Sequence, residues 1–463
     1  MSTDTVPTPP GPLPRPTVLT PAQIRCLEEA KIFLSEPHPQ VSTIRKVSAA
    51  FRAPKPSSSP SSSSTASASM SFQGYNPDVI HTFDIPIAIE SREVLEYIGF
   101  VPEVSRVIYD RYRKRPDSEQ NPDDLIAYVS GHLSALKLSQ YDNMSPKDAL
   151  RDIGLNQEIQ GAITDPEFSQ IFGTESLFYW AKDTVEINYA ALLSKQKVLE
   201  SYANHLLAQK EKSNGPRGHS DQSLDDQTTT PGQAVTATIS MTPSDFKFPN
   251  TRVRVEADSP LLMDDHVSLY KGKAHSELKQ RGAIIWENGA VNPSALVTAP
   301  GSDFNWNCNA HYWTPEKETA ENYRRYVARR CPEAETCIIH IQVPRQFLNN
   351  LYQEDLWFSP EWKEYVWTCR SMVQPDEKFD RLWKPGRADL VRGPICCVGD
   401  RIFAISEDDI QMSITESYVM RLSTGRKATQ WVFLQNETIT QLAEQIKGKL
   451  HFILFQATRR SDE

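Results

Sequence analysis

The chain has 463 residues, 39% of them hydrophobic, and its 50 basic and 59 acidic residues give a formal net charge of −9. This length is enough for two or three domains of about 100–200 residues each. An acidic chain is not expected to bind nucleic acid through its phosphates or to dock on an anionic membrane, because both need a basic protein surface.

The cysteines and the first residues of the chain indicate a compartment. The seven cysteines are odd in number and irregular in spacing, which is typical of reduced thiols. Residues 1–16 lack a basic start followed by an apolar run, so we expect no secretory signal. No apolar run reaches about 18 residues, so we expect no membrane span. The expected location is intracellular, in the cytoplasm, with the nucleus as the alternative.

Residues 1–74 are predicted to form a disordered leader. The segment is rich in Pro, and it ends in the Ser-rich stretch PSSSPSSSSTASASMS. Such a composition does not bury enough apolar surface to offset the chain entropy that folding costs. One short amphipathic helix is predicted inside the leader at 21–36, with Thr20 as its N-cap and Pro21 in its first turn.

Residues 75–212 are predicted to form an all-α domain. Several segments have apolar residues at helical spacing, and they begin with the cap-like sequences NPDD, SPKD and TDPE. No catalytic constellation is found here, and His132 and His205 are isolated. We therefore expect a scaffold or a domain that binds another protein. The polar residues 213–245 follow as a linker.

Residues 246–458 change to a pattern of short strands. Strands are predicted at 247–257 and from His266 onward, and helices at Pro315–Arg330 and Glu437–Lys447. Thr314 is the predicted N-cap of the first of these helices. Short strands with few intervening helices are typical of an α+β domain. The predicted fold class is therefore multidomain, with an all-α domain followed by an α+β domain.

Two predicted strand ends carry side chains that a ligand could use. Tyr270-Lys271-Gly272 ends an apolar strand, and the glycine there would allow a ligand or another strand to approach closely. Tyr312-Trp313-Thr314 precedes the helix at 315–330, whose N-terminus favours a polar or anionic group. The alternative is structural, with Lys271 as an exposed lysine at a strand end and Tyr312 as a core tyrosine.

Glu361 and Glu364 flank Trp362 in a run that is rich in aromatic residues. A carboxylate among aromatic rings could orient a sugar hydroxyl or stabilise a developing positive charge. In a regular strand, residues three positions apart face opposite sides, so one of the two would face a cleft. The alternative is that Glu364 is a surface acid on an alternating strand.

A metal site is not expected. Four residues are possible zinc ligands by their side chains, namely Cys308, His311, Cys331 and Cys337. Their spacing is not that of a standard structural zinc site. Gly272-Lys273 lacks the upstream glycine of a phosphate-binding loop, which disfavours nucleotide hydrolysis.

The order of these motifs resembles the ADP-ribosyltransferase-like fold. The resemblance is to small domains of unknown function that are related to the diphtheria-toxin and poly(ADP-ribose) polymerase group, and it covers about residues 266–446. The matching pieces follow the family's order: Tyr270-Lys271-Gly272, Asp303-Phe304, His311-Tyr312-Trp313-Thr314, Ala320 with Tyr323, Glu361-Trp362-Lys363-Glu364-Tyr365, Cys369-Arg370, Asp389 to Pro394, and Trp431-Val432-Phe433.

The resemblance implies two small antiparallel sheets around a cleft that holds the nicotinamide end of NAD, the substrate. A residue of the first strand would hold the ribose or amide, a tyrosine after the second strand would stack on nicotinamide, and a glutamate near a later strand would bind the ribose. These roles fall on Lys271, on Tyr312, and on Glu361 or Glu364. Tyr270, Gly272 and Thr314 would complete the NAD site.

The sequence departs from the family pattern at two places. Lys271 stands where the closest members have His, and a lysine does not reproduce imidazole geometry. The phenylalanine and glycine that family members usually have before the tyrosine are missing, and an Asn-rich insertion, NWNCNAH, stands before Tyr312. Two functions therefore follow from the resemblance. One is an NAD-dependent ADP-ribosyltransferase or NAD glycohydrolase, and the other is a non-catalytic interaction protein whose helical domain binds a protein partner.

Overall fold

The computed structural model describes residues 19–34, 44–48, 66–73, 82–115, 123–136, 138–141, 143–213, 253–280, 284–286 and 288–457. Most of the Pro- and Ser-rich leader lies outside the described residues, and so do residues 214–245 of the predicted linker. The described part combines helices with two larger sheets and one small sheet, which confirms a mixed helix and sheet fold.

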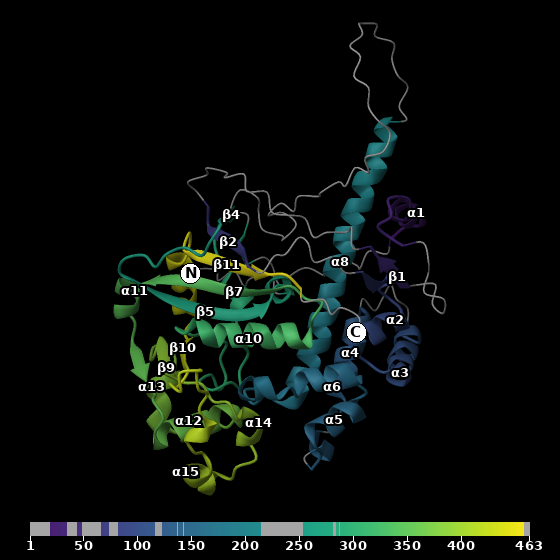
Figure 1. Ribbon diagram of the computed structural model, residues 1–463. Helices are drawn as coiled ribbons and strands as arrows, with labels where there is room; N and C mark the ends of the chain where they lie inside the picture. Colours follow the sequence, from purple (N-terminus) through teal and green to yellow (C-terminus); the bar gives the residue numbers. More distant parts are fainter. Residues whose placement is uncertain are drawn as a thin grey trace, which may run out of the picture.

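The helical half is a set of short helices around one long one (Figure 1). Side-chain caps begin several of the short helices, for example Asp124 at α4 and Ser145 at α5. The last helix, α8, is much longer than the others. The helices are α2 (Arg92–Tyr97), α3 (Pro102–Arg113), α4 (Leu125–Ser134), α5 (Pro146–Ile153), α6 (Gln157–Ile163), α7 (Ser169–Phe172) and α8 (Leu177–Ser213).

The leader contributes more structure than its composition predicts. Helix α1 (Pro21–Glu29) forms with Thr20 as its N-cap, as predicted, and it packs on α8. Strand β1 (Ile44–Val47) pairs with β3 (Phe83–Pro86), and β2 (Ala68–Gln73) joins a sheet. The prediction of disorder through residue 74 is therefore wrong for β1 and β2. In β2, apolar side chains alternate with serines and the apolar face is buried.

Two sheets form the α+β half. The order of the first sheet is β4 (Val253–Val255), β2, β11 (Leu450–Phe455), β7 (Thr336–Pro344) and β5 (His266–Ala274). That of the second is β6 (His311–Trp313), β10 (Thr429–Phe433), β9 (Leu390–Pro394) and β8 (Gln353–Asp355). Both sheets are mixed and not antiparallel as expected, because β2 pairs in parallel with β4 and β11, and β8 with β9.

The two sheets meet at one bridge between β5 and the end of β6. Tyr270 and Thr314 exchange backbone hydrogen bonds of 2.7 and 3.0 Å. Strands that come from different sheets therefore place Tyr270, Lys271, Tyr312 and Thr314 close to one another.

The helices of the α+β half surround these sheets (Figure 1). They are α9 (Glu277–Gln280), α10 (Lys317–Arg330), α11 (Arg345–Asn349), α12 (Pro360–Arg370), α13 (Asp380–Trp383), α14 (Gly399–Ile402), α15 (Ile410–Ser413) and α16 (Asn436–Gln445). Single 3₁₀ turns occur at Leu138–Tyr141, Pro166–Phe168, Pro293–Leu296, Glu377–Phe379, Glu407–Asp409 and Glu416–Tyr418. Among the described helices, none is both long and apolar enough to cross a membrane.

Two of these helices differ from their sequence prediction. Helix α10 begins two residues later than expected, with Glu316 at the N-cap position instead of Thr314. Helix α12 occupies the segment that was interpreted as an alternating strand. Its N-cap is Ser359, and its buried residues Trp362, Tyr365, Val366 and Cys369 have the spacing of one helix face.

Helix α10 joins the helical half to the α+β half. The hydroxyl of Tyr326 donates a hydrogen bond of 2.7 Å to the carbonyl of Ile163. Arg330 is fully buried and pairs with Asp183 of α8 at 2.7 Å. Residues of both halves belong to one hydrophobic core, so the two halves pack as one body at this interface.

Candidate functional site

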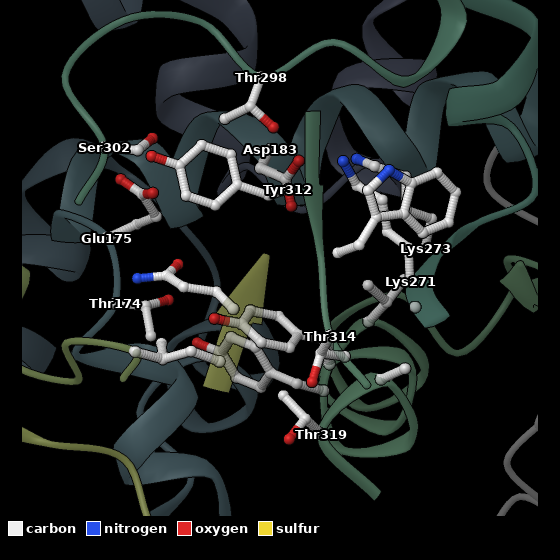
Figure 2. Close-up of a pocket in the computed structure, with 18 of the residues that line it drawn as sticks. Thr174, Glu175, Asp183, Lys271, Lys273, Thr298, Ser302, Tyr312, Thr314 and Thr319 are labelled. Carbon is white, nitrogen blue, oxygen red and sulfur yellow. The ribbon is translucent and has the colours of Figure 1, made fainter. Parts of the chain in front are cut away.

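A pocket of about 190 Å³ lies where the two sheets meet the helical half. One wall comes from β5 and β6, a second from α10, and a third from residues 174–183 around the start of α8. Figure 2 shows Glu175, Ser302 and the Tyr312 hydroxyl on one side of the view, and Lys271 and Lys273 on the other. The segments predicted as strand ends therefore meet in one pocket, which the helical half closes. Lys271 and Tyr312 lie within β5 and β6, however, and not at the ends of these strands.

Lys271 projects from β5 at the pocket. Its ammonium donates a hydrogen bond of 3.0 Å to the carbonyl of Leu296, and the residue is partly buried. Burial, together with the positive charge of Lys271, lowers the pKa of His311 to about 3. His311 is therefore neutral at physiological pH, and the lysine carries the positive charge in this region.

Tyr312 is held by its hydroxyl. The oxygen accepts a hydrogen bond of 2.8 Å from the backbone N–H of Phe304 and donates one of 2.9 Å to Asn305. Burial, with the nearby charge of Asp303, raises the pKa of Tyr312 well above its usual value. The ring is thus neutral and fixed, which suits stacking on a flat ligand better than proton transfer.

Gly272 and Thr314 line the pocket but have structural partners. A Cβ on Gly272 would lie 2.0 Å from the carbonyl oxygen of Ala320, so this glycine allows α10, rather than a ligand, to approach β5. The Thr314 hydroxyl bonds the carboxylate of Glu316, which also accepts hydrogen bonds from Thr429. Glu316 is the N-cap residue of α10, but its carboxylate bonds Thr314 and Thr429 and does not cap the helix.

Glu361 and Glu364 do not line the pocket. Both lie on helix α12, so the alternation of a strand does not apply to them. Glu361 pairs with Arg381 and Glu364 with Lys378. The interpretation of Glu364 as a surface acid fits this position, although the element that carries it is a helix and not a strand.

Four other carboxylates line the pocket, namely Glu175, Asp183, Glu277 and Asp303. Asp303 is buried and accepts hydrogen bonds from the Arg370 guanidinium, the Gln430 amide and the backbone N–H of Cys396, at 2.7 to 2.9 Å. Its acceptor capacity is therefore used within the protein.

Asp183 and Glu277 are bound to basic side chains. Asp183 pairs with Arg330, whose guanidinium also lies over the rings of Trp180 and Tyr326 at 4.7 and 4.6 Å. Glu277 pairs with Lys273 and accepts a hydrogen bond from the backbone of Ala274. Both carboxylates stabilise the pocket wall.

Glu175 differs from the other three. Its side chain is 29% exposed, and its ion-pair partner among the described residues is Arg370, at 3.4 Å. Burial raises the pKa of Glu175, and the Arg370 charge opposes this effect. Sequence reasoning missed this residue because it lies in the helical half, far along the chain from the strand motifs. The aromatic residues that follow it, FYW, gave only a helical signal.

The strands that follow α12 in the chain contribute Gln430, from β10, to the pocket. No glutamate of these strands is among the described residues that line it. The amide of Gln430 donates to Asp303 at 2.8 Å and to the carbonyl of Pro394 at 3.1 Å. The residue is 5% exposed, so its amide is fixed in the pocket wall.

Among the described residues, no three His, Cys, Asp or Glu side chains are grouped to hold a metal ion. Comparisons of the chain with protein-family models, with curated proteins and with solved structures find no match. The function must therefore be inferred from the residues of the pocket, where a lysine and a fixed tyrosine from two sheets face a carboxylate from the helical half.

Proposed function

We propose that the pocket binds the nicotinamide end of NAD and that the protein is an ADP-ribosyltransferase or an NAD glycohydrolase. The observation that carries this proposal is the meeting of Lys271 and Tyr312 in one pocket between two sheets. The sequence resemblance gives these two residues the roles of ribose or amide contact and of stacking partner.

The size of the pocket fits one end of the dinucleotide. Its volume is about 190 Å³, whereas sites that enclose a drug-sized ligand have roughly 300–1,000 Å³. The nicotinamide ring and the ribose next to it would lie at the pocket, and the rest of the molecule would lie outside. A pyridinium ring would stack on Tyr312, and Lys271 would donate a hydrogen bond to the amide oxygen or to a ribose hydroxyl.

The reaction breaks the bond between C1′ of the ribose and the nicotinamide nitrogen. The electron pair of that bond passes to the nitrogen, which loses its positive charge, and a cation-like centre develops at C1′. Water or the nucleophile of an acceptor then forms the new bond to C1′ and releases one proton. A pocket that holds the ring and the ribose in fixed positions favours this step through orientation.

The test is NAD binding by isothermal titration calorimetry together with nicotinamide release by chromatography. We expect the wild-type protein to bind NAD and to release nicotinamide. The Tyr312→Ala variant should bind NAD roughly tenfold more weakly, because the stacking surface is lost. Tyr352→Ala is the matched control, because Tyr352 is 52% exposed and does not line the pocket. A folded wild-type protein that neither binds nor consumes NAD would contradict the proposal.

One observation favours the non-catalytic alternative. The later strand that reaches the pocket carries Gln430, and its amide is already bonded to Asp303. An amide has no negative charge with which to stabilise a developing cation. NAD binding without measurable nicotinamide release, either from NAD alone or with protein acceptors, would support a sensor or interaction protein. Release that Tyr312→Ala abolishes would exclude this alternative.

A further inference from the structure

The four carboxylates of the pocket differ in the number and length of their bonds to other groups of the protein. Asp303 accepts from three donor groups, Asp183 is paired with a buried arginine, and Glu277 is paired with Lys273. Glu175 has one longer ion pair, of 3.4 Å, and a partly exposed side chain. Of the four, it has the longest ion pair and the most exposed side chain, which favours it as the carboxylate that accepts from a ligand.

Glu175 lines the pocket from a segment between two helices. The residue lies between α7 and α8, and Figure 2 shows its carboxylate on the same side of the view as Ser302 and the Tyr312 hydroxyl. Trp180, farther along the same segment, donates its indole N–H to the carbonyl of Phe172 at 2.6 Å. This hydrogen bond ties the start of α8 to α7 on either side of Glu175, so the backbone that carries the carboxylate is held in place.

The cation beside Glu175, Arg370, is shared with another carboxylate. Arg370 is 7% exposed and bonds Asp303 at 2.7 Å, which is shorter than its contact with Glu175. One guanidinium thus serves two carboxylates, and the nearer one takes the stronger bond. Burial raises the pKa of Glu175, and the charge of Arg370 opposes this effect. Hydrogen-bond donors from a ligand would favour the charged form of this carboxylate.

We propose that Glu175, from the helical half, binds the ribose hydroxyls next to the nicotinamide ring when NAD occupies the pocket. The inference rests on the proposed function and adds a ligand residue that lies outside the α+β half. Glu175 would take the ribose-binding role that the resemblance gives to Glu361 or Glu364, which lie outside the pocket. It would also supply a carboxylate where β10 has Gln430. NAD would then contact both halves of the protein at once.

The experiment compares two ligands on one variant. Glu175→Gln keeps the shape of the side chain and leaves the Arg370–Asp303 pair in place, so we expect it to fold. By calorimetry, its affinity for NAD should fall tenfold or more, as expected for the loss of a hydrogen bond to a charged group. Its affinity for nicotinamide, which has no ribose, should stay within about twofold of the wild-type value.

The matched control is Glu361→Gln, because Glu361 is a glutamate of the other half that lies outside the pocket. Its affinity for both ligands should equal that of the wild type. Thermal unfolding of each variant shows that it is folded, and Glu175→Ala gives a second test of the same position.

Two outcomes overturn the inference while leaving the proposed function intact. One is unchanged NAD affinity in Glu175→Gln and Glu175→Ala. The other is an equal loss for NAD and nicotinamide, which would mean that the residue shapes the ring site and does not bind the ribose. Failure of the wild-type protein to bind NAD would instead remove the proposed function, and this inference with it.

Discussion

Hydrogen bonds fix the residues of the pocket before any ligand is bound. The hydroxyl of Tyr312 is held between Phe304 and Asn305, and Lys271 is bonded to the carbonyl of Leu296. A ligand that stacks on this tyrosine would not have to immobilise it, so little side-chain entropy is lost on binding. Lys271 is bonded to Leu296 through one of the three N–H donors of its ammonium.

A substitution at Gly272 tests how closely α10 must approach β5. In Gly272→Ala the new methyl group would lie 2.0 Å from the Ala320 carbonyl oxygen and 2.8 Å from the Arg324 nitrogen. Both contacts are with backbone, which cannot rotate away. We expect a loss of at least about 3 kcal/mol in the free energy of unfolding, measured by urea denaturation.

Gly161→Ala is the matched control for that variant. Gly161 lies inside α6, and a Cβ there would meet nothing within 4 Å. Alanine is the better helix former, so this variant should be more stable than the wild type by about 0.5–1 kcal/mol. Equal stabilities of the two variants would show that Gly272 does not set the distance between α10 and β5.

Elements whose own residues form a periodic pattern could be predicted, and elements that depend on distant partners could not. The strand at β5 and the helices α1, α10 and α16 were predicted; α10 and α16 differ from their predicted boundaries by one or two residues, whereas α1 ends at Glu29 and not at residue 36. Strand β2 was missed because serines fill its polar face, where Ser69 and Ser71 bond the ring of His451, almost 400 residues away in the chain. In α12 the aromatic residues hid the helical spacing.

Helix α10 is one of the elements that couple the two halves. Its Arg330 is fully buried, and its guanidinium bonds Asp183 and Thr184 of α8. In Arg330→Met the side chain keeps most of its volume, but Asp183 loses its partner. We expect the free energy of unfolding to fall by about 3–5 kcal/mol, because a largely buried carboxylate is left without its partner. Urea denaturation followed by circular dichroism measures this loss.

Arg325→Met on the same helix provides the comparison. Arg325 pairs with Glu167 across the same interface, but the two side chains are 46% and 54% exposed. Solvent screens such a pair, so the loss should stay below about 1 kcal/mol. If both arginine variants lose the same stability, the buried pair does not hold the halves together.

At the scale of the whole molecule, the pocket is made by both halves, and this limits what the sequence could predict. Lys271 and Tyr312 were predicted from the strand patterns around them, and they lie within β5 and β6 of the α+β half. Glu175 and Arg330 gave no signal, because their roles depend on how α8 packs against α10 and on where Arg370 lies. A periodic pattern identifies an element and its buried face, but it does not identify the element that packs against it.

Two buried histidines lie on neighbouring strands of the five-stranded sheet. His340 of β7 and His451 of β11 are opposite each other in the antiparallel pair. His340 bonds the Ser268 hydroxyl at 3.0 Å, and its ring stacks on Tyr270 at 4.7 Å. Burial is the first cause that lowers the pKa of each histidine to about 4, and the charge of Lys317 adds to it.

These histidines make the stability of the protein depend on pH. Their pKa is about 4 in the folded state and about 6.5 in the unfolded chain. The folded state therefore binds fewer protons between these values, and stability is lost as the pH falls from 6.5 towards 4. Each histidine contributes up to roughly 3 kcal/mol to this loss.

The prediction is tested by urea denaturation at about pH 7.5 and about pH 4.5. In His451→Asn the side chain can still bond serines but cannot gain a proton, so the difference in unfolding free energy between the two pH values should shrink by roughly 2–3 kcal/mol. His205→Gln, on the exposed surface of α8, should leave the difference unchanged. If His451→Asn shows the full wild-type difference in unfolding free energy between the two pH values, the acid sensitivity comes from other groups and not from this buried histidine.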